Sequence, residues 1–303
     1  MANRLVTLGN LRKPEEPLRV RICTPYRSTL PNGFVALIEQ IMHFGIPGYN
    51  AYMLKRETTV VHFGRNSLVD TPGHDKVPFD YLFFIDDDNT LSPGDTFTKR
   101  SDPDGIFTEG LPMMVYWMKR ILDHHLPICS GVYVGRVQPH LPMVYEDSTD
   151  NPGFYENILD LPEDQLIEVA AVGTGFMCIR RDVFETMQAR MQQNRDRWEL
   201  AVQQDPTLAE FAIPDLHPPF WNAWRQRVTD QAWEPVGEDI FFCEQARKLG
   251  YKIMVDTGVK VPHKSEMYVT YDHYEAAFKE RAIEQKSILR EKWTKEAEAR
   301  KAG

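Results

Sequence analysis

The sequence has few cysteines, and they lie far apart. The four cysteines in 303 residues form no C-x-x-C pair, which argues against the usual zinc and thiol redox motifs. Each cysteine lies among apolar residues, so we expect buried free thiols in a protein of a reducing compartment. They are Cys23, Cys129, Cys178 and Cys243.

The sequence also lacks long apolar runs and an excess of positive charge. We find no segment of the apolar length that a membrane span requires, and residues 1–17 show no signal-peptide pattern. We therefore expect a cytoplasmic protein without a membrane span. The 35 Lys and Arg residues are outnumbered by 44 Asp and Glu residues, which gives a net charge of −9. This balance argues against a surface built mainly to bind nucleic acid phosphates, although it is compatible with a local basic groove.

Apolar residues make up 42% of the chain and charged residues 26%, as is typical of a folded globular protein. Along the first half, strand-like and helix-like apolar patterns alternate, with turn residues between them. Strands are expected at 18–22, 49–54, 81–85 and 127–134, and helices at about 34–42 and 111–125. This alternation predicts an α/β fold, a central mostly parallel sheet flanked by helices.

The pattern also predicts a domain organisation. An N-terminal extension over 1–17 precedes one α/β domain over 18–268, in which the polar region of about 188–233 is interpreted as an insertion or lid. Residues 269–303 are predicted to form a C-terminal amphipathic helix that packs on its own domain. The apolar stripe of this helix would be Tyr274, Phe278, Ala282, Leu289 and Trp293.

Five apolar residues, 81–85, run directly into Asp86, Asp87 and Asp88. An unbroken apolar run predicts a strand buried on both faces, and the carboxylates must lie where that strand emerges, because burying them bare is costly. Asp86 and Asp88 project to the same side of an extended chain, where they could share a divalent cation, Mn²⁺ or Mg²⁺. The alternative is a solvated polar loop.

Two other known motifs contain closely spaced aspartates. An EF-hand loop that began at Asp86 would need Gly and Glu where the chain has Leu91 and Phe97, so the sequence excludes a calcium-binding EF-hand here. The D-x-D-x-T pattern resembles that of haloacid-dehalogenase-type phosphatases, which implies Asp86 as a phosphorylated nucleophile and Asp88 as the general acid. That family carries its motif on the first strand and needs a downstream Lys and a second acidic pair after Gly-Asp. In this chain the motif comes later, and the downstream acidic motif is Gly-Glu-Asp at 237–239. The phosphatase is the enzyme alternative.

Three further motifs have both a structural and a functional interpretation. Glu238 and Asp239 follow a glycine at a predicted helix start, where carboxylates cap a helix or act as an acid–base pair. His263 is either a structural residue or a metal ligand. The turn Gly173-Thr174-Gly175 is too short for a dinucleotide fingerprint, and it allows either a tight turn or a close approach to a ligand.

Six motifs follow one another within residues 18–265. They are Thr24-Pro25, Arg65-Asn66, Phe84-Ile-Asp-Asp-Asp88, Gly173-Thr-Gly-Phe-Met-Cys-Ile-Arg-Arg-Asp-Val-Phe184, Gly237-Glu-Asp-Ile-Phe-Phe-Cys243 and Val261-Pro-His263. In this order they resemble the GT-A fold, family-2-like glycosyltransferases, particularly the compact bacterial and phage forms. The resemblance implies a hexosyl- or pentosyltransferase that uses a nucleotide-diphosphate sugar, with UDP as the expected nucleotide.

The resemblance also implies which residues bind the donor. The nucleotide-binding residues would be Thr24, Pro25, Arg27, Arg65, Asp86 and Asp87. The stretch 24–27 would lie by the base, Arg65 near the base or the diphosphate, and Asp86 at the ribose. Asp88 and His263, with Asp86 as a further candidate, would bind Mn²⁺ or Mg²⁺ that bridges the diphosphate. The consecutive acids leave open which of them holds the metal.

For catalysis, the resemblance implies Asp239 as the base if the enzyme inverts the sugar configuration. Glu238 would contact the acceptor or the donor sugar, and Gly173, Thr174 and Gly175 would shape the sugar pocket. An aromatic, Pro-rich stretch suggests His217 and Trp221 as acceptor contacts. The acceptor itself stays open between protein, glycan, small molecule and modified DNA base, as does the oligomeric state. A non-catalytic nucleotide-sugar-binding module on the same scaffold is the non-enzyme alternative.

Overall fold

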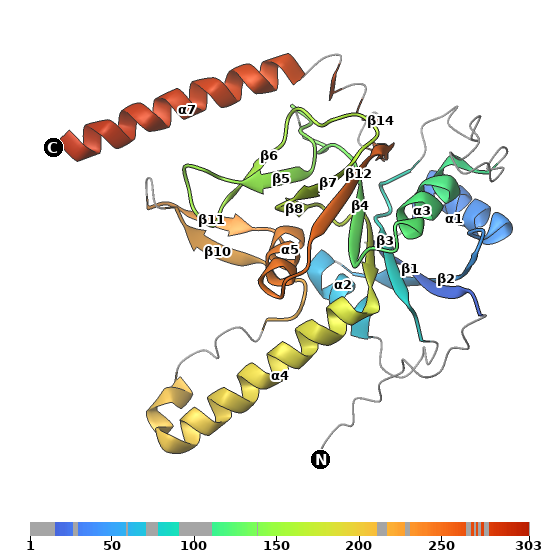
Figure 1. The fold of residues 1–303 in the computed structure, drawn as a ribbon, viewed down its shortest axis with the longest axis horizontal. Helices are drawn as coiled ribbons and strands as arrows, with labels where there is room; N and C mark the ends of the chain where they lie inside the picture. Colours follow the sequence, from blue (N-terminus) through green and yellow to red (C-terminus); the bar gives the residue numbers. More distant parts are fainter. Residues whose placement is uncertain are drawn as a thin grey trace.

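A seven-stranded sheet forms the centre of the fold (Figure 1). The computed structural model describes residues 16–26, 30–58, 60–70, 78–90, 111–137, 139–210, 217–227, 231–264, 268–269, 271, 274–275 and 279–302. The strands of the sheet, in spatial order, are β2 (Tyr49–Glu57), β1 (Leu18–Tyr26), β3 (Tyr81–Ile85), β9 (Phe176–Arg180), β4 (Ile128–Val132), β12 (Ile253–Lys260) and β7 (Leu166–Val169).

The sheet is mostly parallel, as predicted. β1 pairs in parallel with both β2 and β3, and β4 pairs in parallel with β12. Two strands are reversed: β9 is antiparallel to β3 and β4, and β7 is antiparallel to β12. The expected α/β fold is therefore confirmed, with two reversals that the alternation of elements did not predict.

Helices cover both faces of the sheet. They are α1 (Asn32–Phe44) and α3 (Met113–Asp123) on one face, and α2 (Val61–Asp70), α4 (Arg181–Gln204) and α5 (Glu238–Lys248) on the other. β3 contributes to both cores, since Tyr81, Phe83 and Ile85 belong to the first hydrophobic cluster and Leu82 and Phe84 to the second. All of β3 is buried, so the predicted strand with two covered faces is confirmed.

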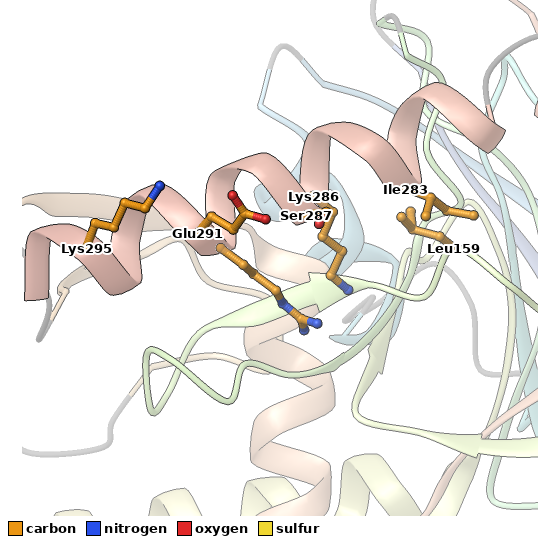
Figure 2. Close-up of a pocket in the computed structure, with 7 residues that line it drawn as sticks. Leu159, Ile283, Lys286, Ser287, Glu291 and Lys295 are labelled. Carbon is orange, nitrogen blue, oxygen red and sulfur yellow. The ribbon is translucent and has the colours of Figure 1, made fainter. Parts of the chain in front are cut away.

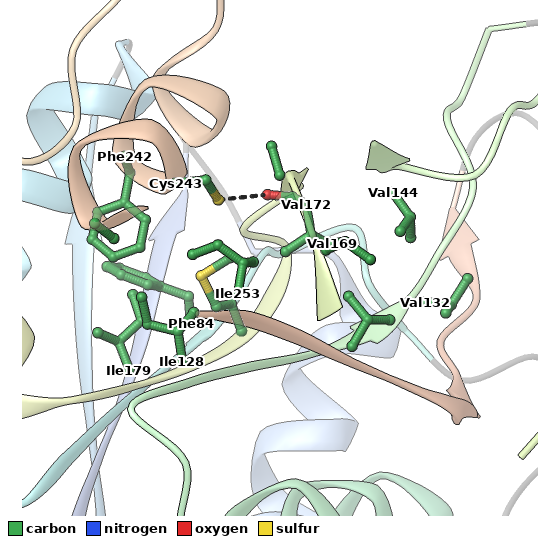
Figure 3. Close-up of a cluster of buried hydrophobic side chains, with 14 of the residues drawn as sticks. Phe84, Ile128, Val132, Val144, Val169, Val172, Ile179, Phe242, Cys243 and Ile253 are labelled. Carbon is green, nitrogen blue, oxygen red and sulfur yellow. Dashed lines mark hydrogen bonds between the residues drawn. The ribbon is translucent and has the colours of Figure 1, made fainter. Parts of the chain in front are cut away.

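The second cluster joins the central sheet to α5 (Figure 3). Phe242 of α5 stacks on Phe220 with ring centroids 4.8 Å apart, and Phe220 meets Phe84 of β3 edge-on at 5.3 Å. The Cys243 thiol donates a hydrogen bond to the carbonyl of Val172 over 3.6 Å. Burial raises the pKa of this thiol to about 12, and all four cysteines are free and buried, as expected.

β9 runs antiparallel to both of its neighbours, β3 and β4. The chain enters β9 from β8 (Ala171–Val172), a strand of a smaller sheet, through the short turn Gly173-Thr174-Gly175. β9 therefore begins at the edge of the sheet where β3 ends, and Ile85 pairs there with Phe176. The reversal brings the Gly-Thr-Gly turn next to the three aspartates.

Smaller elements surround the central sheet. A second sheet has the order β6-β5-β8, and two ribbons pair β10 with β11 and β13 with β14. The remaining elements are β5 (Val144–Asp147), β6 (Tyr155–Asn157), η2 (Pro206–Glu210), β10 (Ala223–Gln226), β11 (Trp233–Val236), β13 (His263–Lys264), β14 (Tyr268–Val269) and α7 (Lys279–Ala302).

The predicted start of the insertion at residue 188 falls inside a helix. α4 runs unbroken over 24 residues (Figure 1). Its buried residues, Val183, Phe184 and Met187, all lie in the first two turns. Beyond them the helix is polar, and without an apolar stripe the sequence gives little sign of a helix.

α7 lies along the small sheet (Figure 1). Lys286 and Arg290 lie 3.2 and 3.1 Å from a carboxylate oxygen of Glu156. In the predicted apolar stripe, Tyr274 and Ala282 are buried, while the side chains at 278, 289 and 293 lie outside the described residues. Within the part of the chain that the structure describes, no helix has the length and apolarity needed to cross a membrane.

Candidate active site

Acidic residues gather where β3 ends. Asp86, Asp87 and Asp88 follow the strand directly, and the amide of Asp86 donates to the carbonyl of Gly175 over 3.0 Å. A cavity of about 250 Å³ lies beside them. It is lined by Pro25, Tyr26, Thr58, Val61, Asp86, Asp87, Asp88 and Arg136. The three carboxylates thus lie at the carboxyl edge of the sheet, where open α/β sheets bind ligands.

Asp86 is paired with a buried arginine. Both oxygens of Asp86 accept hydrogen bonds from Nη2 of Arg65, at 2.9 and 2.8 Å, and Nη1 of Arg65 donates to Oε1 of Glu238. Burial lowers the pKa of Arg65, which is 3% exposed, but the two carboxylates raise the pKa more, so it stays charged. Burial raises the pKa of Asp86 in spite of this pairing. The arginine clamp, Arg65 with Asp86 and Glu238, joins the end of β3 to the start of α5.

Asp88 has different partners. Its Oδ1 lies 3.2 Å from Nε2 of His263, and its Oδ2 lies 2.7 Å from Nη1 of Arg136. Nδ1 of His263 lies 2.7 Å from the carbonyl oxygen of Val134, and since a carbonyl can only accept, Nδ1 carries a proton. Burial raises the pKa of Asp88, but His263 and Arg136 lower it more, so the carboxyl is ionised at neutral pH.

The pair formed by Asp88 and His263 fits a divalent cation. In a neutral His263 ring, the Nε2 lone pair faces the Asp88 carboxylate, and two such acceptors need a proton or a metal ion between them. Metal-binding histidines usually donate their second ring N–H to a carbonyl or carboxylate, as His263 does. Among the described residues, no three His, Cys, Asp or Glu side chains form a metal cluster. A cation held by this pair would therefore need further oxygen ligands from substrate or water.

Glu238 and Asp239 begin α5. Oδ1 of Asp239 accepts a hydrogen bond from the amide of Ile240 over 2.8 Å. Burial, followed by the charge of Glu238, raises the pKa of Asp239 to about 6. Gly237 leaves room for this carboxylate, because a Cβ at that position would lie 2.8 Å from Oδ1 of Asp239. Asp239 is thus a carboxylate that can exchange a proton near neutral pH, although it does not line the 250 Å³ cavity.

The Gly-Thr-Gly turn makes room for Tyr133. A Cβ on Gly173 would lie 2.0 Å from the Tyr133 hydroxyl oxygen, and a Cβ on Gly175 would lie 2.5 Å from Oδ1 of Asn89. The Tyr133 hydroxyl accepts a hydrogen bond from the Gly175 amide over 3.0 Å, and its ring packs edge-on against His263 at 5.3 Å. The turn therefore has a packing role, through the ring that supports His263.

Several buried polar atoms in this part of the structure make no hydrogen bond. These are Oγ1 of Thr24, Thr90 and Thr174, both side-chain amide atoms of Asn89, and Nε of Arg65. Buried polar groups are generally satisfied by protein, water or ligand. Such atoms mark positions where water or a ligand would complete the site.

The predicted nucleotide-binding residues lie in different places. Pro25, Asp86 and Asp87 line the cavity, and Arg65 pairs with Asp86 in the arginine clamp. Thr24 is buried in β1. The remaining one, at position 27, lies outside the described residues.

The predicted acceptor contacts come together. His217 stacks on Trp221 with ring centroids 4.8 Å apart and an interplanar angle of 16°. Trp221 meets His62 of α2 edge-on at 5.9 Å, and His217 meets Phe241 of α5 at 6.0 Å. This aromatic stack joins α2 to α5, the helices that also carry the clamp arginine and the acidic pair.

Sequence reasoning missed several residues at the site. Thr58, Val61 and Arg136 line the cavity, and Tyr133 supports His263. Arg136 could have been found, because it follows the predicted strand at 127–134, whose carboxyl end lies at the same edge as that of β3 in a parallel sheet. Tyr133 gave no such signal, because within an apolar run it resembles an ordinary core residue.

Another cavity, with a volume of about 650 Å³, lies elsewhere, under α7 (Figure 2). Its lining consists of Leu159, Ile283, Lys286, Ser287, Arg290, Glu291 and Lys295. Lys286 and Arg290 are already paired with Glu156 of the small sheet. The smaller cavity is the better candidate site, because three carboxylates and the Arg136 guanidinium line it and His263 contacts one of those carboxylates, Asp88.

Comparisons with known proteins add little to this geometry. No family model matches the chain, and no curated protein matches it. One solved structure, titled "Crystal structure of a glycosyltransferase involved in the glycosylation of the major capsid of PBCV-1", is similar over 66% of this chain and 81% of its own, with 15% sequence identity and a TM-score of 0.23. A similarity this low carries no argument about function, which has to follow from the geometry of the site.

Proposed function

We propose that this protein is a metal-dependent glycosyltransferase of the GT-A class. It moves a sugar from a nucleotide-diphosphate sugar, with UDP as the first candidate, to an acceptor hydroxyl. The observation that carries the proposal is the Asp88–His263 pair, with Nε2 facing a carboxylate oxygen at 3.2 Å. The pair lies at the carboxyl edge of the sheet, beside a cavity lined by three aspartates and an arginine.

Asp88 and His263 would hold Mn²⁺ or Mg²⁺, with donor phosphate oxygens as further ligands. When bound, the cation supplies the positive charge that stabilises a departing diphosphate. Val134 keeps the His263 ring in the tautomer that leaves Nε2 available. Asp86 is fixed by Arg65, and its oxygens keep lone pairs that can accept from a ribose hydroxyl.

Asp239 would act as the base in an inverting reaction. It accepts the proton of the acceptor hydroxyl while that oxygen bonds to the sugar carbon and the bond to the diphosphate breaks, the electron pair leaving with the diphosphate. A pKa raised to about 6 suits a base that works near neutral pH. Glu238 would contact the donor or acceptor sugar, and the aromatic stack of His217 and Trp221 would hold the acceptor.

Two alternatives give different expectations. A phosphatase would use Asp86 as its nucleophile, but both oxygens of Asp86 accept hydrogen bonds from Arg65, which lowers their nucleophilicity. A non-catalytic binding module would keep donor binding when Asp239 is replaced and would show no turnover.

Thermal denaturation tests the proposal directly. We expect Mn²⁺ together with one family of nucleotide sugars, among UDP-, GDP- and other sugars, to raise the Tm. At about 100 times its Kd a ligand stabilises a protein by roughly 2.7 kcal/mol, which corresponds to several degrees at this chain length. Asp88→Asn should abolish the shift.

Asp182→Asn is the matched control. Asp182 pairs with Arg180 at the end of β9 remote from the site, so this variant should keep the ligand-induced shift. If no nucleotide sugar raises the Tm, and a simple phosphate ester is hydrolysed by the wild type but not by Asp86→Asn, the transferase is excluded in favour of the phosphatase.

A further inference from the structure

Arg136 occupies one oxygen of the proposed cation-binding carboxylate. Its Nη1 lies 2.7 Å from Oδ2 of Asp88, while His263 faces Oδ1. A divalent cation held by Asp88 and His263 would bring a second positive charge to the same carboxylate, and the two charges would repel each other. Arg136 and the cation therefore compete for Asp88.

Arg136 also supplies positive charge to the wall of the cavity. Among the described residues that line it, Arg136 alone carries positive charge, against three aspartates. Arg65, the neighbouring guanidinium, has a side chain that is 4% exposed, and its ion pairs are to Asp86 and Glu238. A diphosphate entering the cavity thus finds Arg136 as the described arginine that can offer it paired N–H donors.

The guanidinium of Arg136 can change partners at small cost. Its side chain is 53% exposed, and ion pairs at such sites contribute little to stability. The preceding backbone is fixed, because the Gly135 amide donates to the carbonyl of Leu141 over 2.8 Å. The long side chain can therefore turn between Asp88 and a ligand while its Cα stays in place.

We propose that Arg136 neutralises Asp88 in the free protein and is displaced when a divalent cation binds to Asp88 and His263, whereupon it pairs with the diphosphate of the nucleotide. The exchange couples the two ligands. The cation frees the guanidinium that the diphosphate needs, and the diphosphate removes the guanidinium that competes with the cation, so each ligand raises the affinity for the other. This inference rests on the proposed function and names how the same site links its two ligands.

Titration calorimetry on the full chain tests the exchange. Mn²⁺ alone is titrated into wild type and Arg136→Gln, and inorganic pyrophosphate is titrated into both at a fixed saturating concentration of Mg²⁺. Pyrophosphate probes diphosphate recognition whichever base the donor carries. We expect Arg136→Gln to bind Mn²⁺ about two- to fivefold more tightly, since a weak competitor is removed. Pyrophosphate should bind about tenfold more weakly, because a charge-assisted pair is lost.

Two control variants separate this exchange from a general effect of charge. Arg136→Lys keeps the positive charge without the planar fork, so Mn²⁺ affinity should stay near that of the wild type while pyrophosphate affinity falls partway. Arg180→Gln removes a guanidinium that pairs with Asp182 at the opposite edge of the sheet. It should change neither affinity.

Three outcomes would overturn the inference. If Arg136→Gln binds Mn²⁺ no more tightly than the wild type, while Asp88→Asn abolishes binding, there is no competition and the proposed cation site still stands. If the wild type binds no Mn²⁺, the inference fails together with the cation part of the proposed function. If Arg136→Gln and Arg180→Gln change the affinities for Mn²⁺ and pyrophosphate equally, the net charge of the protein accounts for the effect and Arg136 has no specific role.

Discussion

Asp86 and Asp88 are two residues apart and have different electrostatic surroundings. Both oxygens of Asp86 are held by Arg65, and burial raises its pKa. In Asp88, burial also raises the pKa, but His263 and Arg136 outweigh it and the net shift is downward. The carboxylate that is both ionised and next to an imidazole is Asp88, so the geometry favours it as the cation ligand.

The arginine clamp leads to a prediction about stability. Arg65→Met should leave two carboxylates facing each other without a counter-charge. Breaking a buried ion pair costs about 3–5 kcal/mol, and we expect somewhat less because Asp86 and Glu238 keep side-chain exposures of 24% and 19%. Urea denaturation measures the change in the free energy of unfolding.

Two variants give the scale for this measurement. Arg65→Lys keeps a charge but loses the fork, so it should fall between the wild type and Arg65→Met. Arg180→Gln breaks a more exposed pair and should change the free energy of unfolding by less than about 1 kcal/mol. If Arg65→Met lowers the free energy of unfolding by a similarly small amount, the arginine clamp does not stabilise the fold as we infer.

Asp239 leads to a prediction about pH. A base must be ionised to accept a proton, and burial with the Glu238 charge raises its pKa to about 6. Transfer activity, measured as kcat/KM, should therefore be low below pH 6 and rise to a plateau above it. Asp239→Asn should lower the plateau by roughly two to four orders of magnitude while donor binding persists.

Asp87 supplies the control for this profile, because burial, with the charges of Asp88 and Asp86, also raises its pKa to about 6. If Asp239 is the base, the acid limb near pH 6 should persist in Asp87→Asn. If the fall in kcat/KM below pH 6 is absent in Asp87→Asn but present in Asp239→Asn, the titrating group is Asp87, and Asp239 is not the base.

At the scale of elements, the reversal of β9 assembles the site. Ile85 and Phe176 pair where β3 ends and β9 begins, so the Gly-Thr-Gly turn, Tyr133 and His263 form one packed unit beside the aspartates. The glycines leave the space that the tyrosine ring fills. The orientation of the His263 ring, the proposed metal ligand, therefore depends on the packing of this turn.

This dependence is testable with Gly173→Ala. The new Cβ would lie 2.0 Å from the Tyr133 hydroxyl oxygen, so the ring must move, and overpacking of this kind costs typically about 1–3 kcal/mol. Both the Tm and the Mn²⁺ affinity should fall. Combining it with Tyr133→Phe should recover part of the loss, because the nearest clashing atom is gone.

Gly135→Ala is the matched glycine control. A Cβ there would meet its nearest neighbours at 3.5 and 3.7 Å, ordinary contact distances. Its Tm should stay close to that of the wild type. If Gly173→Ala is tolerated equally well, the turn is not packed as the structure describes.

At the scale of the whole molecule, α7 lies apart from the three aspartates at the carboxyl edge of the central sheet. α7 contacts the small sheet through Lys286 and Arg290, which pair with Glu156. The proposed cation ligands, Asp88 and His263, lie together beside the end of β3. Ending the chain after residue 278 removes the helix together with its ion pairs. Exposed pairs contribute little each, so we expect the Tm to fall by about a few degrees and the Mn²⁺ affinity to stay within about twofold.

Lys286→Gln combined with Arg290→Gln tests the ion pairs alone, since it keeps the helix and its buried Ala282. Its Tm should lie between those of the wild type and the truncated chain. Loss of Mn²⁺ binding on truncation would show that α7 supports the site after all.

The sequence by itself determined the local features. The apolar run at 81–85 specified a strand covered on both faces, and its three following carboxylates had to lie at the end of that strand. Turn residues and apolar spacing likewise placed α1, α3 and α5 within a few residues. These features follow from the local secondary-structure preferences of the residues and from the free-energy cost of burying charge. Both can be read from a short stretch of sequence without knowledge of its partners.

Only the tertiary structure decided which groups meet. Arg65 and Glu238, in one ion pair, are 173 positions apart, and the partners of Asp88 come from β13 and from the loop after β4. The direction of β9 follows from its pairing with two strands, β3 and β4, that lie far from it in the sequence. Strand order and direction arise from pairing between distant segments, which periodicity along the chain does not encode, so the sequence supplied the candidate side chains and the sheet determined their partners.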